Sequence, residues 1–128
     1  MGALTKAQIL QADDLGCERV DIPEWKGHAY VRVLSGAERD AWEASLLDSD
    51  DKVSIKNIRA KFAVAVLCDG KGAAMFADAD VEQVGKKSAA ALDRIFEAGR
   101  KLNRLRKEDV EELAKNSGGG QGADSSSA

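Results

Sequence analysis

The longest uninterrupted apolar run of the chain lies near its middle, at residues 62–68. Taken alone, so short a run fits a buried strand as well as a helix. Helical spacing begins upstream of it, because apolar residues recur at steps of three and four at Ile55, Ile58, Phe62 and Ala65. Arg59 and Lys61 lie off this apolar face, which favours the helix. We predict a helix over 55–68, ended by the glycine-containing turn 69–72, with the apolar patch 73–76 folded back on it.

Two capping boxes predict where helices begin in the first third of the chain. In this motif two side chains three residues apart each accept the backbone N–H of the other residue, and the pairs here are Thr5–Gln8 and Ser35–Glu38. Two aspartates and a glycine at 13–16 keep the first helix short. The second helix carries Trp42 and Leu46 one turn apart, on one face.

Alternation of apolar and charged residues predicts a β-hairpin between these two helices. Val20 and Ile22 alternate with charged neighbours, as Val31 and Val33 do on either side of an arginine. The connecting segment 23–28 contains a proline, a glycine and an aromatic residue, which is typical of a turn.

The second half of the chain predicts further helices. Asp78 or Asp80 caps a short helix that Gly85 ends, and a long helix begins near Ser88. Its apolar seam is Leu92, Ile95, Phe96, Gly99, Leu102 and Leu105, and its opposite face carries Arg94, Arg100, Lys101 and Arg104. A last helix covers 108–115, and the Gly/Ser-rich tail 117–128 is predicted to be disordered. The expected fold is α+β, a mostly helical single domain over 1–116 with a small N-terminal β-hairpin.

Composition agrees with a soluble globular domain, since 44% of the 128 residues are hydrophobic and 32% are charged. The sequence has no apolar run long enough to span a bilayer, and Lys6 interrupts the N-terminus before a signal-peptide core could form. We therefore expect a cytoplasmic protein without membrane partners. Cys17 and Cys68 lie far apart in sequence and should both be reduced, with Cys68 in the core.

Charge is unevenly distributed along the chain. Residues 13–51 hold eleven acidic residues against four basic ones, and residues 86–107 hold eight basic residues against two acidic ones. Such opposite ends can associate head to tail or steer a charged partner, and they equally describe two ordinary solvated faces. Nucleic acid is not expected as a partner, because no aromatic residue lies among the positive charges (Phe96 belongs to the apolar seam) and the acidic half would repel phosphate.

No residue constellation in the sequence predicts catalysis, a cofactor or a metal. The one histidine, His28, lies on a predicted turn without a second histidine to pair with. The segment 85–88 lacks the glycine that a phosphate-binding loop needs five residues before its Gly-Lys pair. The acidic turn 48–51 lacks the central glycine and the closing glutamate of a calcium loop. These features favour a binding protein and not an enzyme.

An ordered series of short motifs runs along most of the chain. The motifs run from L-T-x-x-x-I-L-x-A-x-D-L at 4–15, through V-x-I-P-E-W at 20–25, Y-V-R at 30–32, S-G-x-E-R-D at 35–40, R-A at 59–60, L-C-D at 67–69 and M-F at 75–76, to D-A-D-V-E at 78–82, G-K-K-S at 85–88 and L-N-R-L at 102–105. Together these motifs resemble the tail assembly chaperones of long-tailed, siphovirus-like phages and prophages, and the likeness covers about 4–116. It implies a protein of the host cytoplasm that coats the tape measure protein, keeps it soluble and recruits tail tube subunits before the tube forms.

The resemblance also implies two possible lengths of product, through a programmed ribosomal frameshift near the end of the short reading frame. Ala114-Lys115-Asn116 is what the codons GCA-AAA-AAC would encode, and A-AAA-AAC is a slippery heptamer. A runner-up role from a different class is a structural head–tail connector or tail-completion protein of the virion.

A chaperone of this kind needs exposed surface that holds a helical partner for a time. The candidate partner-binding residues are Trp25, Tyr30, Trp42, Arg94, Arg100, Lys101 and Arg104. Tyr30 and Trp42 also suit a hydrophobic core, and Trp42 qualifies only if it lies outside.

Overall fold

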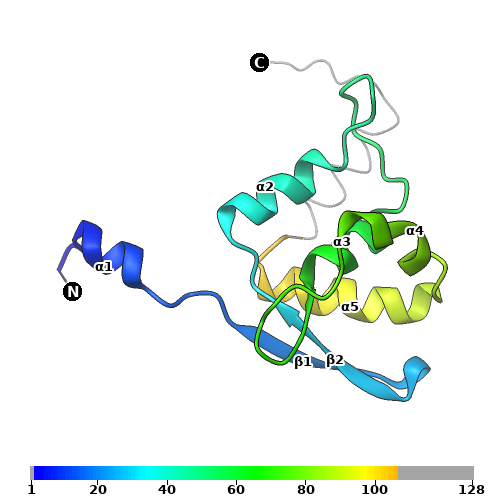
Figure 1. Ribbon diagram of the computed structural model, residues 1–128, viewed down its shortest axis with the longest axis horizontal. Coiled ribbons are helices and arrows are strands. Elements are labelled where there is room, and N and C mark those ends of the chain that lie inside the picture. Colours follow the sequence, from blue (N-terminus) through cyan, green and yellow to red (C-terminus); the bar gives the residue numbers. More distant parts are fainter. Residues whose placement is uncertain (1, 107–128) are drawn as a thin grey trace.

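The computed structural model describes residues 2–106 of the chain (Figure 1). Its elements, in order, are α1 (Lys6–Gln11), β1 (Cys17–Ile22), the 3-10 turn η1 (Pro23–Trp25), β2 (Gly27–Arg32), α2 (Gly36–Ala44), α3 (Ile58–Val66), β3 (Leu67–Cys68), the 3-10 turn η2 (Asp78–Asp80), α4 (Val81–Val84) and α5 (Ala89–Leu102). Helices and a small sheet in one body confirm the predicted α+β class. The predicted helix 108–115 and the predicted disordered tail 117–128 lie outside the described residues.

The predicted hairpin is present and forms most of a three-stranded antiparallel sheet in the order β1-β2-β3. Strands β1 and β2 pair along their whole length, from Cys17 opposite Arg32 to Ile22 opposite Gly27. The turn between them is tight because η1 begins with a proline and Lys26 follows in the left-handed conformation, with φ of 55°.

The central helix is shorter than the sequence predicts, and this part of the prediction is wrong. Helix α3 ends at Val66, and Leu67 and Cys68 form strand β3 opposite Val31 and Tyr30 of β2. Leu67 has extended backbone angles, with φ of −67° and ψ of 133°. Pairing with a strand that lies more than thirty residues upstream therefore determines the conformation of this segment, although local periodicity favours a helix there.

The core centres on Phe62 of α3. Its ring contacts Trp42 of α2 at a centroid distance of 5.0 Å and Phe96 of α5 at 4.9 Å. Helix α5 crosses α3 at Gly99, where an added Cβ would lie only 2.8 Å from Cε2 of Phe62. The glycine of the predicted apolar seam is therefore what lets these two helices approach each other closely.

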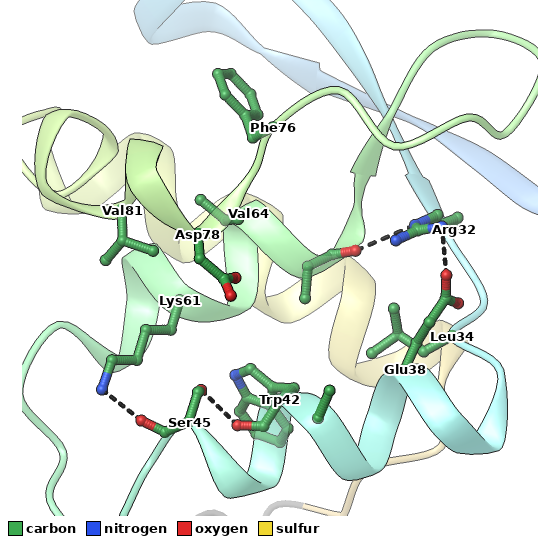
Figure 2. A pocket seen from close by; sticks show the side chains of 12 residues that line it. Arg32, Leu34, Glu38, Trp42, Ser45, Lys61, Val64, Phe76, Asp78 and Val81 are labelled. Carbon is green, nitrogen blue, oxygen red and sulfur yellow. Dashed lines mark hydrogen bonds and ion pairs between the residues drawn. The ribbon is translucent and has the colours of Figure 1, made fainter. Parts of the chain in front are cut away.

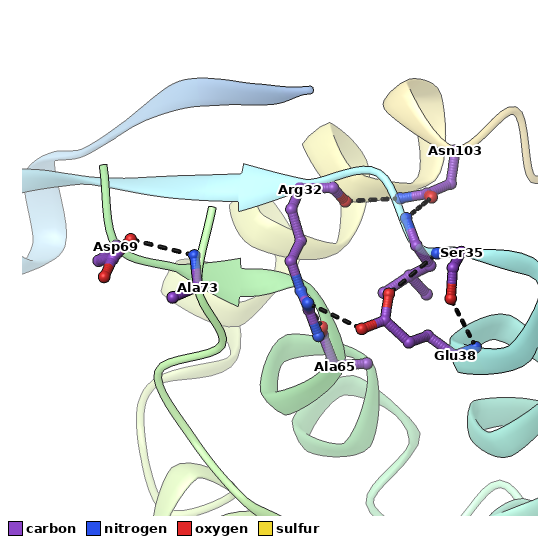
Figure 3. Close-up of polar contacts among 8 residues, drawn as sticks. Arg32, Ser35, Glu38, Ala65, Asp69, Ala73 and Asn103 are labelled. Carbon is purple, nitrogen blue, oxygen red and sulfur yellow. Dashed lines mark hydrogen bonds and ion pairs between the residues drawn. The ribbon is translucent and has the colours of Figure 1, made fainter. Parts of the chain in front are cut away.

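The α5 terminus holds the start of α2 in place through Asn103 (Figure 3). Its amide nitrogen donates to the carbonyls of Arg32 and Gly99, at 3.1 and 2.9 Å. Its amide oxygen accepts the backbone N–H of Leu34 at 2.7 Å. One side chain therefore ties the segment that leads from β2 into α2 to the end of α5.

Helix α1 stands apart from the rest of the described chain. Figure 1 shows it beyond an extended segment, away from the body formed by the sheet and the other helices. The predicted capping box is present, since Thr5 Oγ1 accepts the Gln8 N–H at 3.2 Å and Gln8 Oε1 accepts the Thr5 N–H at 2.9 Å. No residue of α1 is buried.

Candidate functional site

Four of the eight large apolar side chains that are exposed within residues 2–106 lie in the N-terminal arm, which we define as residues 2–16. Leu4, Ile9, Leu10 and Leu15 expose between 54% and 73% of their surface. Clusters of exposed apolar side chains on a folded protein can mark interaction sites, whereas single exposed ones need no explanation. These residues are not among the partner-binding candidates predicted from the sequence. The sequence shows a short capped helix with apolar side chains, but not whether another surface covers it.

The tip of the hairpin presents Trp25 beside an ion pair that docks the tip on α5. Glu24 and Arg94 approach to 2.7 Å, Oε1 to Nε. The hydrogen bond from Arg94 holds the pKa of Glu24 below its usual value. Trp25 is 40% exposed. An aromatic ring held at a fixed turn, with much of one side open, suits an interface anchor.

The four basic residues predicted to share one face of the long helix do not form one surface in the structure. Arg94 is engaged by Glu24, and Arg100 donates to Glu97 and to the carbonyl of Leu105 with a side chain only 18% exposed. Arg104 follows the helix in a left-handed conformation, with φ of 56°. Lys101 is exposed and lines a shallow groove between α5 and β1, where Glu18 and Asp21 also lie. The structure therefore brings Arg94 and Lys101 to one groove and places Arg100 and Arg104 elsewhere.

Of the other two aromatic candidates, Tyr30 is half-buried on β2 and Trp42 is 4% exposed. The Tyr30 ring meets His28 edge-on at a centroid distance of 5.5 Å. Trp42 lies inside the core. It is a candidate surface anchor only if it lies outside, so it does not qualify as one.

Trp42 nevertheless forms the floor of a pocket of about 200 Å³ between α2, α3 and the segment that leads into α4 (Figure 2). Leu34, Val64, Phe76 and Val81 supply apolar wall, and charged side chains lie around it. The indole Nε1 is buried and has no hydrogen-bond acceptor among residues 2–106.

The charged groups near this pocket are held by other parts of the chain. Arg32 donates to Glu38 Oε2 at 2.9 Å and to the carbonyl of Ala65 at 3.1 Å (Figure 3). The Ser35 backbone N–H and then the Arg32 guanidinium keep the pKa of Glu38 below its usual value. Lys61 Nζ donates to the carbonyl of Ser45 at 2.7 Å, which satisfies a carbonyl at the end of α2.

Within residues 2–106, no group of three or more His, Cys, Asp or Glu side chains is placed to hold a metal ion. In the acidic turn, Asp48 Oδ1 instead accepts the backbone N–H groups of Asp50 and Lys52, which lowers the pKa of Asp48. Both cysteines are free thiols, and burial raises the pKa of Cys68, which lies in the core as predicted. None of the helices in this part of the chain has the length and apolar character to cross a membrane.

Known proteins resemble this chain both in sequence and in fold. The model of the phage tail assembly chaperone family matches residues 6–116. No curated protein matches the sequence. The fold is similar to that of the bacteriophage HK97 tail assembly chaperone, with a TM-score of 0.53 and 21% sequence identity, over 75% of this chain and 94% of that one. The family match spans most of the chain, and the α+β body with its three-stranded sheet is the fold that the structural likeness supports. The chain belongs to the phage tail assembly chaperone family.

Proposed function

We propose that this protein binds the tape measure protein in the host cytoplasm and recruits tail tube subunits to it during tail assembly. The observation that carries the proposal is membership of the tail assembly chaperone family over residues 6–116. A chaperone of this kind acts by adhesion and release and makes or breaks no bond. The partner must therefore be held by surface that the folded body leaves open.

The N-terminal arm and the hairpin tip are the surfaces that best suit this task. The arm supplies apolar side chains that contact little of the described chain, and the tip supplies Trp25 with Arg94 and Lys101 in the neighbouring groove. Apolar area provides affinity for the apolar stripe of an amphipathic helix, and the charges favour one orientation over the other. Tyr30 and Arg100 are weaker candidates, because the chain itself partly covers or engages them. Arg104 is exposed but lies outside the groove that holds Arg94 and Lys101.

Binding to purified tape measure protein, measured by surface plasmon resonance, tests the proposal. We expect Ile9→Ser together with Leu10→Ser to weaken binding by at least about tenfold, because each buried apolar side chain contributes roughly 1.5–3 kcal/mol. Trp25→Ala should also weaken binding while the melting temperature hardly changes. Met75→Ser is the matched control, since Met75 is 53% exposed but lies outside both surfaces.

Two outcomes would contradict parts of the proposal. Unchanged binding with a large loss of stability in Trp25→Ala would assign Trp25 to the core. Equal binding by the arm variant, the Met75 control and the wild-type protein would remove the arm from the interface.

A second candidate function is a permanent head–tail connector or tail-completion subunit. Mass spectrometry of purified particles separates the two, because a chaperone leaves the finished particle and a connector stays in it at stoichiometric amount. The presence of a long tape measure gene next to this one would favour the chaperone.

We further propose that a longer form of the protein is made by frameshifting near Ala114-Lys115-Asn116. These residues lie outside the described part of the structure, so the proposal depends on the sequence alone. The gene sequence tests it, because codons that cannot re-pair after a one-base slip would exclude it.

Self-association is the remaining partner proposal, supported by the opposite charge of residues 13–51 and 86–107. If it occurs through these charges, the molar mass measured by light scattering should fall as salt is raised, since screening weakens exposed charge pairs. A molar mass that does not depend on salt would contradict the charge-driven mode.

A further inference from the structure

We propose that the pocket over Trp42 is a peptide-binding site. It takes one apolar side chain of the bound segment, and the indole N–H donates to a free backbone carbonyl of the same segment. This inference rests on the proposed function for the identity of the partner, and it adds where and how a segment of that partner is held. The occupant is a segment of protein, and two features of the pocket indicate this: its size and the hydrogen-bond donor in its floor.

The first feature is size. A pocket of about 200 Å³ is smaller than the roughly 300–1,000 Å³ typical of small-molecule sites, and so it suits a single side chain and not a cofactor. Its wall is apolar where Leu34, Val64, Phe76 and Val81 line it. Interface anchors characteristically fill pockets of this kind, where they lose contact with water.

The second feature is the donor in the floor. Trp42 is 4% exposed, and its Nε1–H has no acceptor among residues 2–106. A buried donor without a partner is costly, and native proteins rarely keep one without a reason. Figure 2 shows the indole nitrogen on the side of the ring that faces Lys61 and Asp78, across the pocket. An acceptor brought in by an occupant would satisfy it.

The two basic side chains that line the pocket are already bound by other parts of the chain. Lys61 is bound to the carbonyl of Ser45, and Arg32 is bound to Glu38 and to the carbonyl of Ala65. These bonds fix the pocket wall before any partner arrives, which reduces the ordering that binding requires. The pocket wall is therefore preorganised, and the buried indole N–H still lacks an acceptor among residues 2–106.

The hydrogen bonding of backbone carbonyls limits which segments of the partner can bind in the pocket. Inside an uninterrupted helix every carbonyl is bonded to the N–H four residues on, whereas the last four carbonyls of a helix and those of extended segments are free. The pocket therefore suits a helix end or an extended stretch of the tape measure protein, and not the middle of a long helix. Contacts along a helix are left to the arm and the hairpin tip.

The test follows the two indole N–H signals of the full-length protein by ¹⁵N–¹H NMR, with Trp25→Phe used to assign them. The probes are overlapping short peptides that cover the tape measure protein. We expect a binding peptide to shift the Trp42 signal downfield, as a new hydrogen bond requires, and Trp42→Phe to weaken that peptide by roughly 3- to 10-fold.

A matched pair of variants on α2 tests the pocket without altering Trp42. Ala41 and Ala44 are both exposed, and only Ala41 lines the pocket. Leucine and alanine are both good helix formers, so neither substitution should disturb the helix. Ala41→Leu places its own side chain at the pocket and should weaken peptide binding on the order of 10- to 100-fold. Ala44→Leu should stay within about twofold, as expected of a surface substitution.

Several results would overturn the inference. Peptides that bind without moving the Trp42 signal, or that bind Ala41→Leu as well as Ala44→Leu, would place the partner elsewhere and leave the proposed function standing. A Trp42 signal that shifts in unliganded Asp78→Ala would show that the Asp78 carboxylate already accepts the indole N–H. Failure of the wild-type protein to bind both the peptides and intact tape measure protein would overturn the inference and the proposed function together.

Discussion

Helices α1 and α2 begin with the same reciprocal capping contacts and lie in opposite environments. At α2, Ser35 and Glu38 exchange backbone N–H bonds of 3.1 and 2.9 Å, much as Thr5 and Gln8 do at α1. Yet α2 buries Trp42 against Phe62, whereas α1 buries nothing. A capping box is a local arrangement that sets where a helix starts. What a helix contributes to the fold depends on contacts with distant residues.

Helix α2 is therefore part of the packed body, whereas α1 leaves its surface open. Helix α2 is held from three sides, by Phe62, by Lys61 and by the Asn103 side chain before its first turn. Helix α1 has its own capping bonds and little else in the described chain. The proposed binding of a partner to the arm therefore leaves the core undisturbed.

The largest expected effect comes from removing the side chain on which α2 packs. Phe62→Ala should lower the free energy of unfolding by about 3–5 kcal/mol, because a fully buried aromatic ring is lost and a cavity remains. Urea unfolding followed by tryptophan fluorescence measures it. Ile9→Ala in the arm is the control and should change stability by less than about 0.5 kcal/mol. Similar losses in both variants would show that α1 is packed in solution.

The second prediction concerns the tie between α5 and the start of α2. Asn103→Ala removes three hydrogen bonds and leaves the Leu34 N–H and the Arg32 carbonyl without their partner. We expect a loss of about 1–3 kcal/mol in the free energy of unfolding, the usual cost of unsatisfied polar groups away from water. Hydrogen exchange should localise the loss to the first turn of α2. Uniform exchange across the protein would contradict the assigned role.

Local patterns in the sequence predict helix starts and the hairpin well, because caps, turns and alternation depend on neighbouring residues. They mispredict Leu67 and Cys68, whose conformation is decided by pairing with β2. They also cannot assign Asn103, which in sequence is one polar residue at a helix end. Its three bonds reach residues up to 71 positions away.

The residues of the candidate site also fall into two groups, those whose exposure the sequence predicts and those whose exposure it does not. Trp25 and Lys101 are exposed, as a turn residue and the polar face of an amphipathic helix should be. Trp42 looks the same in sequence whether it faces out or in, and only the packing of α2 on α3 places its indole in the floor of a pocket. The open arm could not be predicted either, since a sequence does not show that a capped helix lacks a surface to cover it.

The third prediction uses the one chemical difference between the two capping boxes, because Glu38 titrates and Gln8 does not. The folded state holds the pKa of Glu38 below its unfolded value, so the unfolded chain binds the proton more readily. This stabilisation is full above the unfolded pKa of about 4.3 and is lost as pH falls through the folded value. Melting temperature measured from pH 7 to pH 3 should fall, and Glu38→Gln should make the fall shallower. An equal fall in Glu38→Gln would mean that Glu38 does not contribute.

The smallest expected effect gives the sharpest test of the comparison, and it uses matched substitutions of the two capping residues. Ser35→Ala should cost about 1 kcal/mol of global stability, the usual value for a lost cap on a packed helix. Thr5→Ala removes the same contact from α1, and the melting temperature should not change, because unfolding of the body does not depend on α1. Its effect should be local and visible as faster amide exchange at Gln8, whose N–H loses its acceptor. If Thr5→Ala costs as much as Ser35→Ala, the arm is packed on the body in solution, and the surface proposed for the tape measure protein is already covered.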